Sequence, residues 1–506
     1  MSTPGPPAAS PELASPSDEV QQWPMYVAGE WLPARRGGTF ESVDPFTGRA
    51  WAVVANAGAE DVDLAVTRAR SALNGGFGAL DARARARLML RLGTLIARDT
   101  ERLAQIESRD NGKLLRETRA QVLALPDWLR FFAGVAETLH GTTPAPDRDD
   151  VFLFTRPEPI GIAAAIVPWN SPLQLLIWKL APAFAAGCPL IAKPSEHTPV
   201  SALALAALVD EVGFPPGAFS VLPSDGPVVG TALAAHPGID KMAFTGSIQV
   251  GVAVAQLMME RVGRVTLELG GKSAQVVLPD ADLEAATNGV IAGIFAASGQ
   301  TCVAGSRLLV HERVHDELVE RIVARARTIM MGDPMEPATE MGPLGNPQQL
   351  RKVVSMVEAA RRDGATIATG GEQPPLGGLF YAPTVITDVT PEMEISREEV
   401  FGPVLAVTPV TDEDHAVALA NATPYALAAG VWTSDIRAAH RLVRRIKAGT
   451  VWVNTYRTVA PYAPFGGMKQ SGIGRESGLR AVEEYVENKT VWIDLSGRSR
   501  DPFVVG

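Results

Sequence analysis

Apolar residues recur every three or four positions through residues 59–140, as Leu88, Leu92 and Leu95 do. This spacing predicts amphipathic helices. Residues 25–48 before them are typical of a short hairpin closed by a Pro/Gly turn. Residues 151–156 after them predict a strand that leaves the helical layer.

From residue 160 the pattern changes to short, continuous apolar runs that alternate with helical stretches. The runs predict strands at 162–167, 189–192, 219–222, 241–244 and 265–267, with helices at 172–186 and 201–212 among them. Such an alternation indicates a parallel sheet covered on both faces, which binds ligands beyond the carboxyl ends of its strands.

A second alternating set begins after Gly271 and runs to Trp452. It opens with predicted strands at 275–278 and 308–310 and predicted helices at 283–297 and 316–330. A late strand at 490–495 has no obvious partner nearby; it is either an ordinary edge strand or completes a sheet in another subunit. The whole pattern predicts an α/β fold.

The composition is that of an ordinary soluble globular protein, with 46% hydrophobic and 20% charged residues. A length of 506 residues predicts two or more domains. The net charge of −10 argues against nucleic-acid binding as a main role. The 2 cysteines cannot build a disulfide framework, which suits a reducing compartment.

Residues 1–21 are rich in Pro, Ser and Ala and predict a disordered leader. They lack the basic start and apolar core of a signal peptide and the arginines of a transit peptide. Because we also find no uninterrupted apolar run of membrane-spanning length, we expect a cytoplasmic protein without membrane contacts.

Cys302 is the first candidate for chemistry. It lies among small residues in the stretch G-Q-T-C-V-A-G, which leaves room for a substrate beside its sulfur. Thiolates are strong nucleophiles, and a site can lower the unperturbed thiol pKa of about 8.5. Taken alone, however, the pattern favours a buried core cysteine, since free cysteine behaves as a small hydrophobe.

Polar residues follow several of the predicted strands, where a parallel sheet binds its ligands. Asn170 could donate its amide to an oxyanion, and otherwise it is a turn asparagine. Lys193 and Glu196 could hold the hydroxyls of a ribose, and the Glu196 carboxylate would favour NAD over NADP because it repels a 2′-phosphate. The alternative is a charged helix start capped by Ser195.

Ser247 and Glu268 follow the next two predicted strands. Ser247 stands in a Gly-Ser turn at a predicted helix start, whose backbone N–H groups can bind a pyrophosphate. Glu268 could act as a general base for water. The G-K-S that follows Glu268 is not a P-loop, because that motif needs glycine at position 266, which is Thr266.

Residues 311–315 match the zinc-protease pattern H-E-x-x-H. That pattern needs both histidines on one face of a helix. His311 ends a predicted strand, and His315 precedes the helix that Asp316 is predicted to open. We therefore expect no metal site here.

Seven short motifs follow one another in the order of a known family. They are P-W-N at 168–170, K-P-S-E at 193–196, F-T-G-S at 244–247 with Gly251, E-L-G-G-K at 268–272, G-Q-T-C at 299–302, E-V-F-G-P at 399–403 and P-F-G-G at 464–467. Together they resemble the aldehyde dehydrogenase superfamily, from about residue 22 to residue 495, in its hydrolytic type that does not acylate coenzyme A.

The resemblance implies a reaction. Cys302 would attack the aldehyde carbon, and the Asn170 amide with the backbone N–H of Cys302 would hold the oxyanion. After hydride transfer to NAD, Glu268 would activate the water that hydrolyses the thioester. Lys179 and Glu476 match positions proposed in relatives to relay the proton away from Glu268. Relatives that pass the acyl group to coenzyme A commonly lack a carboxylate at this place, so a free acid is the expected product.

The resemblance also implies which residues hold the cofactor and the substrate. The expected cofactor contacts are Ile166, Pro168, Trp169, Lys193, Ser195, Glu196, Gly246, Ser247, Gly251, Leu269, Gly270, Glu399 and Phe401. The expected walls of the aldehyde pocket are Trp169, Leu175, Trp178, Thr301, Val303, Arg457, Tyr462 and Phe465. These apolar and aromatic walls suit an apolar or aromatic aldehyde. Arg457 would disfavour a quaternary ammonium aldehyde and would suit an acidic one, unless it is simply a solvated surface residue.

The family's organisation implies a nucleotide-binding domain at 22–142 and 162–272 and a catalytic domain at 273–476. The segments 143–161 and 477–506 would form a bridging element that pairs subunits into a homodimer or homotetramer. Two rival functions stay open: a cysteine hydrolase acting on esters or thioesters, and a non-catalytic protein that keeps the fold.

Overall fold

The computed structural model describes residues 20–498 and residue 503. The predicted leader therefore lies outside the described residues except at its end, where Gln21 already opens strand β1 (Gln21–Trp23). The prediction that residue 21 belongs to the leader is wrong because Gln21 pairs in parallel with Ala52 of β5 (Ala50–Ala55). Strand β4 (Thr39–Val43) completes this three-stranded sheet.

The first large sheet has eight strands in the order β19-β11-β10-β7-β8-β9-β2-β3. Its parallel centre consists of β7 (Ala163–Ile166), β8 (Leu190–Lys193), β9 (Phe219–Val221), β10 (Lys241–Thr245) and β11 (Arg264–Glu268). The predicted hairpin, β2 (Met25–Val27) and β3 (Glu30–Leu32), forms one edge, and β19 (Gly472–Ile473) forms the other. Every residue of β8, β9 and β10 is buried, as expected of strands covered on both faces.

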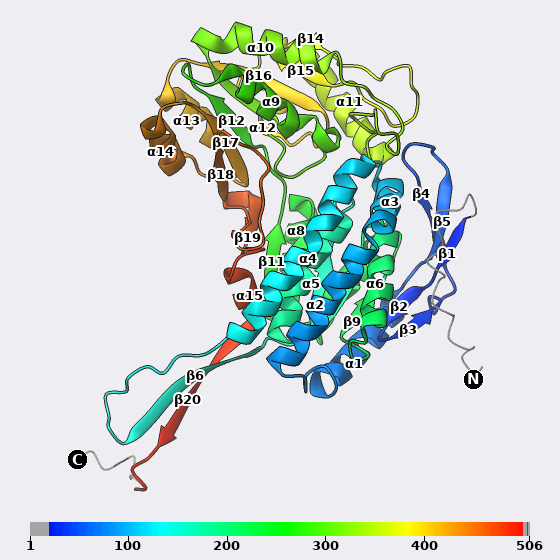
Figure 1. Ribbon diagram of the computed structural model, residues 1–506, viewed down its shortest axis with the longest axis vertical. Helices are drawn as coiled ribbons and strands as arrows, with labels where there is room; N and C mark the ends of the chain where they lie inside the picture. Colours follow the sequence, from blue (N-terminus) through cyan, green and yellow to red (C-terminus); the bar gives the residue numbers. More distant parts are fainter. Residues whose placement is uncertain (1–19, 499–502, 504–506) are drawn as a thin grey trace.

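Helices cover both faces of this sheet (Figure 1). One apolar cluster joins the sheet to α1 (Ala59–Asn74), α7 (Pro227–Ala235) and α8 (Ile248–Met259). The other cluster joins it to α2 (Ala82–Arg98), α3 (Thr100–Asn111), α4 (Leu115–Thr138), α5 (Pro172–Ala186) and α6 (Val200–Val212). Helix α5 is buried along almost its whole length because it lies between the sheet and the outer helices.

The second large sheet has seven strands in the order β14-β15-β16-β13-β12-β17-β18, all parallel to their neighbours except β14. The strands are β12 (Ala274–Val277), β13 (Arg307–His311), β14 (Thr366–Thr369), β15 (Thr384–Thr387), β16 (Val404–Val410), β17 (Ala428–Trp432) and β18 (Thr450–Val453). The helices of this part are α9 (Leu283–Ile294), α10 (Glu312–Ala326), α11 (Pro347–Arg362), α12 (Glu394–Arg397), α13 (Glu413–Asn421) and α14 (Ile436–Arg445). The predicted α/β fold with parallel sheets is confirmed.

The predicted boundaries of two helices are wrong, and the second of these helices, α10, also ends early, at Ala326 rather than at residue 330. Helix α9 ends at Ile294 rather than at residue 297, because Ala297 and Ser298 in the 3-10 turn η1 (Ala296–Gly299) have φ values of 52° and 54°. Helix α10 begins at Glu312 rather than at residue 316, because the His311 ring accepts the N–H of Arg313 and caps the helix. His315 thus lies inside the helix and His311 outside it. Within residues 20–498, no group of three or more His, Cys, Asp or Glu could hold a metal ion.

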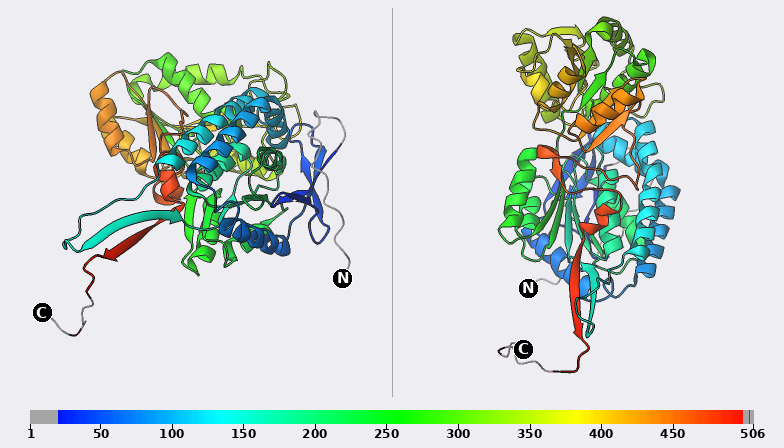
Figure 2. Two further views of the ribbon diagram at one scale, coloured as in Figure 1. Left: turned by 60° about the horizontal axis from the view of Figure 1, so that its bottom comes forward. Right: turned by 90° about the vertical axis from the view of Figure 1, so that its left-hand side faces the viewer.

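A two-stranded ribbon projects from the body of the protein (Figures 1 and 2). It pairs β6 (Val151–Pro159) with β20 (Val486–Asp494) in antiparallel register, so the late strand has its partner within the chain. The short elements α15 (Arg480–Glu483) and η2 (Lys469–Ser471) precede β20. No described helix is long and apolar enough to cross a membrane.

Candidate active site

Cys302 lies in the loop between η1 and β13, at the amino end of that strand. The turn before it is locally strained, since Ala297, Ser298 and Gly299 all have positive φ. A side chain at Gly299 would place its Cβ 2.1 Å from the carbonyl oxygen of Gly402, so only glycine fits there. The Oε1 of Glu117 in α4 accepts the N–H of Ala297 at 2.9 Å. The cysteine loop is therefore held from α4.

Asn170 approaches this loop from the first sheet. It follows β7, is 6% exposed and donates its Nδ2 to the carbonyl oxygen of Gln300 at 2.9 Å. A side-chain amide carries two N–H groups, so one stays available for a second acceptor. Because Gln300 is two residues before Cys302, the free N–H lies beside the cysteine loop.

Glu268 ends β11 and is buried. Neither of its carboxylate oxygens has a hydrogen-bond partner among the described residues. Burial raises the pKa of Glu268 well above its usual value and Glu476 raises it further, while Lys179, Arg475 and the backbone N–H of Gly467, which lies outside hydrogen-bonding geometry, lower it. Buried polar atoms are nearly always hydrogen-bonded, so this carboxylate marks a place for water or a ligand.

Lys179 and Glu476 form an ion pair, and both residues act on the pKa of Glu268. The Lys179 Nζ in α5 contacts Glu476 Oε1 at 2.5 Å and donates to Thr245 Oγ1 at 2.6 Å. Paired backbone hydrogen bonds between Glu476 and Phe465 hold the carboxylate in place. The structure thus brings together three ionisable groups that lie far apart in the sequence.

The protein by itself does not lower the thiol pKa that we considered from the sequence. Burial raises the pKa of Cys302 to about 12, and the charges of Glu268 and Glu399 act in the same direction. The backbone N–H groups of Cys302 and Val303 oppose this effect. The thiol is consequently neutral near pH 7 and reacts only once a base takes its proton.

A cavity of about 800 Å³ opens at the carboxyl ends of β7, β8 and β10, bordered by α7, α8 and α11. Ser247 caps α8 by accepting the N–H of Val250 at 3.4 Å, so the amino end of this helix faces the cavity. Lys193 Nζ lies 3.8 Å from Glu196 Oε2 at another wall. Ser195 does not cap α6, which begins at Val200. The predicted cofactor residues that line the cavity are Ile166, Pro168, Trp169, Lys193, Ser195, Glu196, Gly246 and Ser247.

The remaining predicted cofactor residues lie outside this lining. Glu399 Oε1 accepts the N–H of Gly271 at 2.9 Å, and a Cβ on Gly270 would be 2.6 Å from the same carboxylate. A Cβ on Gly251 would be 2.5 Å from Leu269, so this glycine allows α8 to pack closely against the residue after β11. The ring of Phe401 packs edge-on against Trp169, which does line the cavity, with centroids 5.4 Å apart.

Other residues of the lining were not predicted. Helix α7 contributes Gly230 and Thr231, and the G-P pair at its start was a readable turn signal. His197, next to Glu196, also lines the cavity. Gln349 and Lys352 come from α11, which belongs to the second sheet; no local pattern places that helix beside the first sheet.

Cys302 packs against an apolar cluster that includes four predicted pocket residues, namely Leu175, Trp178, Val303 and Phe465. The rings of Trp178 and Phe465 are 5.2 Å apart, and Thr301 adds a buried hydroxyl without a partner among the described residues. The other three pocket residues do not join the cluster, and one of them, Trp169, lines the cofactor cavity instead. Tyr462 is 71% exposed, and Arg457 donates to the carbonyl oxygen of Ala292 at 3.1 Å.

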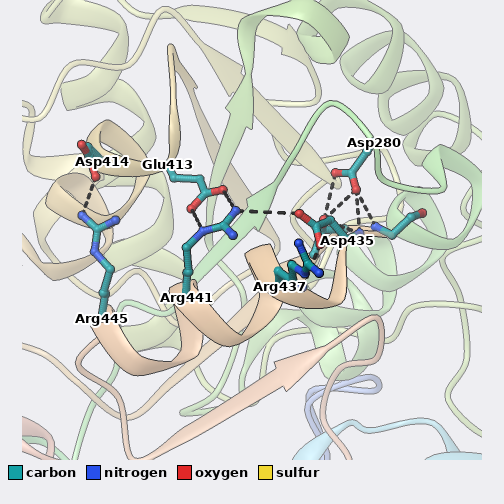
Figure 3. Close-up of polar contacts among 9 residues, drawn as sticks. Asp280, Glu413, Asp414, Asp435, Arg437, Arg441 and Arg445 are labelled. Atoms are coloured by element: carbon teal, nitrogen blue, oxygen red, sulfur yellow. Dashed lines mark hydrogen bonds and ion pairs between the residues drawn. The ribbon is translucent and has the colours of Figure 1, made fainter.

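A second polar cluster lies at the carboxyl ends of the second sheet (Figure 3). A cavity of about 390 Å³ opens beside it. Asp280 accepts the hydroxyl of Thr433 and the N–H groups of Ser434 and Asp435. Asp435 caps α14, and Arg441 pairs with Glu413 at 2.6 Å. These carboxylates are therefore occupied in holding helix ends and loops.

The chain is similar to known proteins over nearly its whole length. Residues 31–491 match the model of the aldehyde dehydrogenase family. Two relatives are each 41% identical: a rat protein named aldehyde dehydrogenase, cytosolic 1, over 99% of this chain and 100% of its own, and an Acinetobacter baylyi (Z)-2-((N-methylformamido)methylene)-5-hydroxybutyrolactone dehydrogenase, over 96% and 100%.

A solved structure, described as the NAD+ complex of an aldehyde dehydrogenase from Bacillus cereus, is 43% identical. It superposes with a TM-score of 0.93 over 94% of this chain and 97% of its own. The resemblance predicted from the short motifs is thereby confirmed. This chain belongs to the aldehyde dehydrogenase family.

Proposed function

We propose that the protein oxidises an aldehyde to the carboxylic acid with NAD+, by way of a thioester on Cys302. The observation that supports this most is the unpaired, buried carboxylate of Glu268, whose charge acts on Cys302. Asn170 brings a free amide N–H to the same loop. A nucleophile, an oxyanion donor and a base thus converge on one place.

The first step joins the sulfur to the substrate. The Cys302 thiol loses its proton to a water molecule, and the thiolate adds to the aldehyde carbon. The carbonyl oxygen becomes an oxyanion, which accepts the free N–H of Asn170 and the backbone N–H of Cys302. With NAD+ bound, the adduct carbon would pass its hydride to the cofactor, which would leave a thioester on Cys302 and NADH.

The second step releases the acid. Glu268 takes a proton from a water molecule, the water oxygen adds to the thioester carbon, and the sulfur leaves as the thiolate. The raised pKa of Glu268 suits a base that must accept a proton near neutral pH. Lys179 and Glu476 form a contact that can carry the proton onward.

The 800 Å³ cavity has the chemistry that a dinucleotide needs. The amino end of α8 would hold the phosphates, and Lys193 with Glu196 would hold the ribose hydroxyls. A carboxylate at Glu196 repels a 2′-phosphate, so NAD is preferred to NADP. Glu399 and Phe401 would hold the nicotinamide side. The B. cereus complex with NAD+ supports the choice of cofactor.

The substrate is an apolar or aromatic aldehyde. The apolar side chains around Cys302 support this choice, since they offer few polar partners. Arg457 and Tyr462 would act at the entrance of the pocket rather than at its base. Arg457→Ala should raise the KM for an acidic semialdehyde more than for hexanal, and equal changes would count against an entrance role.

We further propose the domain division described above, with 22–142 and 162–272 for the cofactor, 273–476 for catalysis, and 143–161 with 477–506 for subunit pairing. The projecting ribbon supports the last part. Its Trp492 is 65% exposed, and Phe152 and Leu495 are exposed as well. Apolar side chains on an isolated two-stranded ribbon favour a homodimer or homotetramer, which a mass measurement in solution would test.

The direct test is NADH formation from aliphatic, aromatic and acid-bearing aldehydes, with NAD and NADP compared and Cys302→Ser as control. We expect NAD-dependent turnover that the substitution abolishes. Ester hydrolysis by Cys302 without any aldehyde oxidation would favour the cysteine hydrolase instead. If neither aldehydes nor esters are turned over, a non-catalytic protein is favoured.

A further inference from the structure

Lys113 is a buried lysine in the turn between α3 and α4 that the proposed reaction does not use. It is 4% exposed. Its Nζ donates to Ser171 Oγ at 2.6 Å and to Gln121 Oε1 at 3.0 Å. Burying an ammonium group is costly unless it is paired, so its position calls for an explanation.

Ser171 connects this lysine to the oxyanion donor. It directly follows Asn170 and stands at the N-cap of α5, where a serine hydroxyl usually accepts a backbone N–H of the helix. Here the hydroxyl makes no such bond and instead accepts the Lys113 ammonium. The lysine thus fixes the residue beside Asn170 at the expense of an ordinary helix cap.

The start of α4 also holds the cysteine loop. Glu117, four residues after Lys113, accepts the N–H of Ala297 in the strained turn before Cys302. Lys113 and Glu117 therefore anchor the two sides of the proposed reaction centre from one short segment. Asn170 and Gln300 then join the two anchored loops directly.

The charges around Lys113 favour its protonated form against the effect of burial. Burial lowers the pKa of Lys113 to about 8, and Arg457 lowers it as well. Glu107 of α3, Glu117 of α4 and a Cys302 thiolate all raise it. The ammonium is thus mostly present at pH 7, and its attraction to a Cys302 thiolate is weaker than the effects of burial, Glu268 and Glu399 on that thiol.

We propose that Lys113 is a positioning residue for aldehyde oxidation. Through the Ser171 hydroxyl it holds Asn170 in the geometry that receives the oxyanion, and its charge favours the thiolate of Cys302. The inference rests on the proposed function for its kinetic part. Its electrostatic part can be tested without aldehyde or cofactor.

The kinetic test compares Lys113→Met, Lys113→Arg, Ser171→Ala and the Lys113→Met/Ser171→Ala double variant. We expect Lys113→Met to lower kcat by about 10- to 100-fold, because a small displacement of a positioned donor costs this much. The KM for hexanal should change less than about threefold, and Lys113→Arg should restore part of kcat. The double variant should be no slower than Lys113→Met, because both changes break one connection.

Arg116→Met is the matched control. Arg116 is exposed, lies in the first turn of α4 beside Glu117 and donates to the carbonyl oxygen of Pro337 at 3.3 Å. Its replacement should leave kcat unchanged. An unchanged kcat in a folded Lys113→Met, or losses that multiply in the double variant, would overturn the positioning role.

The second test follows iodoacetamide labelling against pH. Labelling reports Cys302, because the other cysteine, Cys188, is fully buried. In Lys113→Met the labelling profile should move to higher pH, since the thiolate has lost a favourable charge, and Lys113→Arg should return it. A profile identical to the wild type overturns the electrostatic part. If no aldehyde is oxidised at all, the proposed function fails while this measurement still decides the role of Lys113.

Discussion

The two large parallel sheets contribute to the site from opposite ends. The first sheet presents the carboxyl ends of its strands, where Asn170 follows β7, Lys193 ends β8 and Glu268 ends β11. The second sheet presents an amino end, since Cys302 lies in the loop before β13. One sheet thus follows the usual rule for ligand sites in parallel sheets and the other departs from it.

At the carboxyl ends of the second sheet, the carboxylates hold backbone segments in place instead of binding a ligand. There Asp280 and Asp435 accept several backbone N–H groups, and Asp435 begins a helix. At the first sheet, Glu268 is buried with both oxygens unpaired among the described residues. The difference shows that a position at the edge of a sheet is not enough to make a carboxylate available for chemistry. A carboxylate is available for chemistry where the fold leaves its oxygens free.

The largest effect is expected at Cys302. Replacing it with alanine removes the group placed to bond the aldehyde carbon, so kcat should fall by roughly 10³-fold or more. The steady-state rate of NADH formation measures this. Substantial aldehyde oxidation by the variant would mean that the amino edge of the second sheet does not supply the nucleophile.

Glu268→Gln should slow hydrolysis of the thioester by about 10²- to 10⁴-fold, because a general base is lost while the shape is kept. NADH should then appear in a rapid burst that is followed by slow turnover. Stopped-flow absorbance would separate the two phases. A loss of the burst itself would assign Glu268 to the first step alone.

Lys179→Met and Glu476→Gln should shift the pH profile in opposite directions. Lys179 lowers the pKa of Glu268 and Glu476 raises it. Because the base must be deprotonated, its activity appears as pH rises through its pKa. Removing Lys179 should move that rise to higher pH, and removing the charge of Glu476 should move it to lower pH. The deacylation rate of each variant measured against pH gives both shifts. Equal shifts in one direction would contradict the opposite effects of Lys179 and Glu476 on the pKa of Glu268.

The smallest effect on activity is expected at the opposite edge of the second sheet. Asp435→Ala removes an N-cap and should lower the free energy of unfolding by about 1 kcal/mol. Since Asp435 lies at the carboxyl rather than the amino edge, kcat should stay unchanged. Urea unfolding and NADH assays on the same sample test this, and a large loss of kcat would remove the contrast between the edges.

Local patterns were sufficient for most of the architecture. Continuous apolar runs predicted β7, β8 and β10 because strands buried on both faces need no alternation. Boundaries failed where tertiary contacts outweighed local preference. Helix α9 stops early because Ala297 is held by Glu117 from a distant helix. Helix α10 starts early because the His311 ring accepts a backbone N–H.

The sequence by itself determined the α/β fold, the family and the candidate groups Cys302, Asn170 and Glu268, since these depend on short-range order and motif spacing. Only the tertiary structure decided that Lys179 contacts Glu476, that α11 borders the cofactor cavity and that Lys113 reaches Ser171. It also decided the direction of the Cys302 pKa. Burial and charge at a point in space depend on every segment that packs there, and residues far apart in the chain supply them.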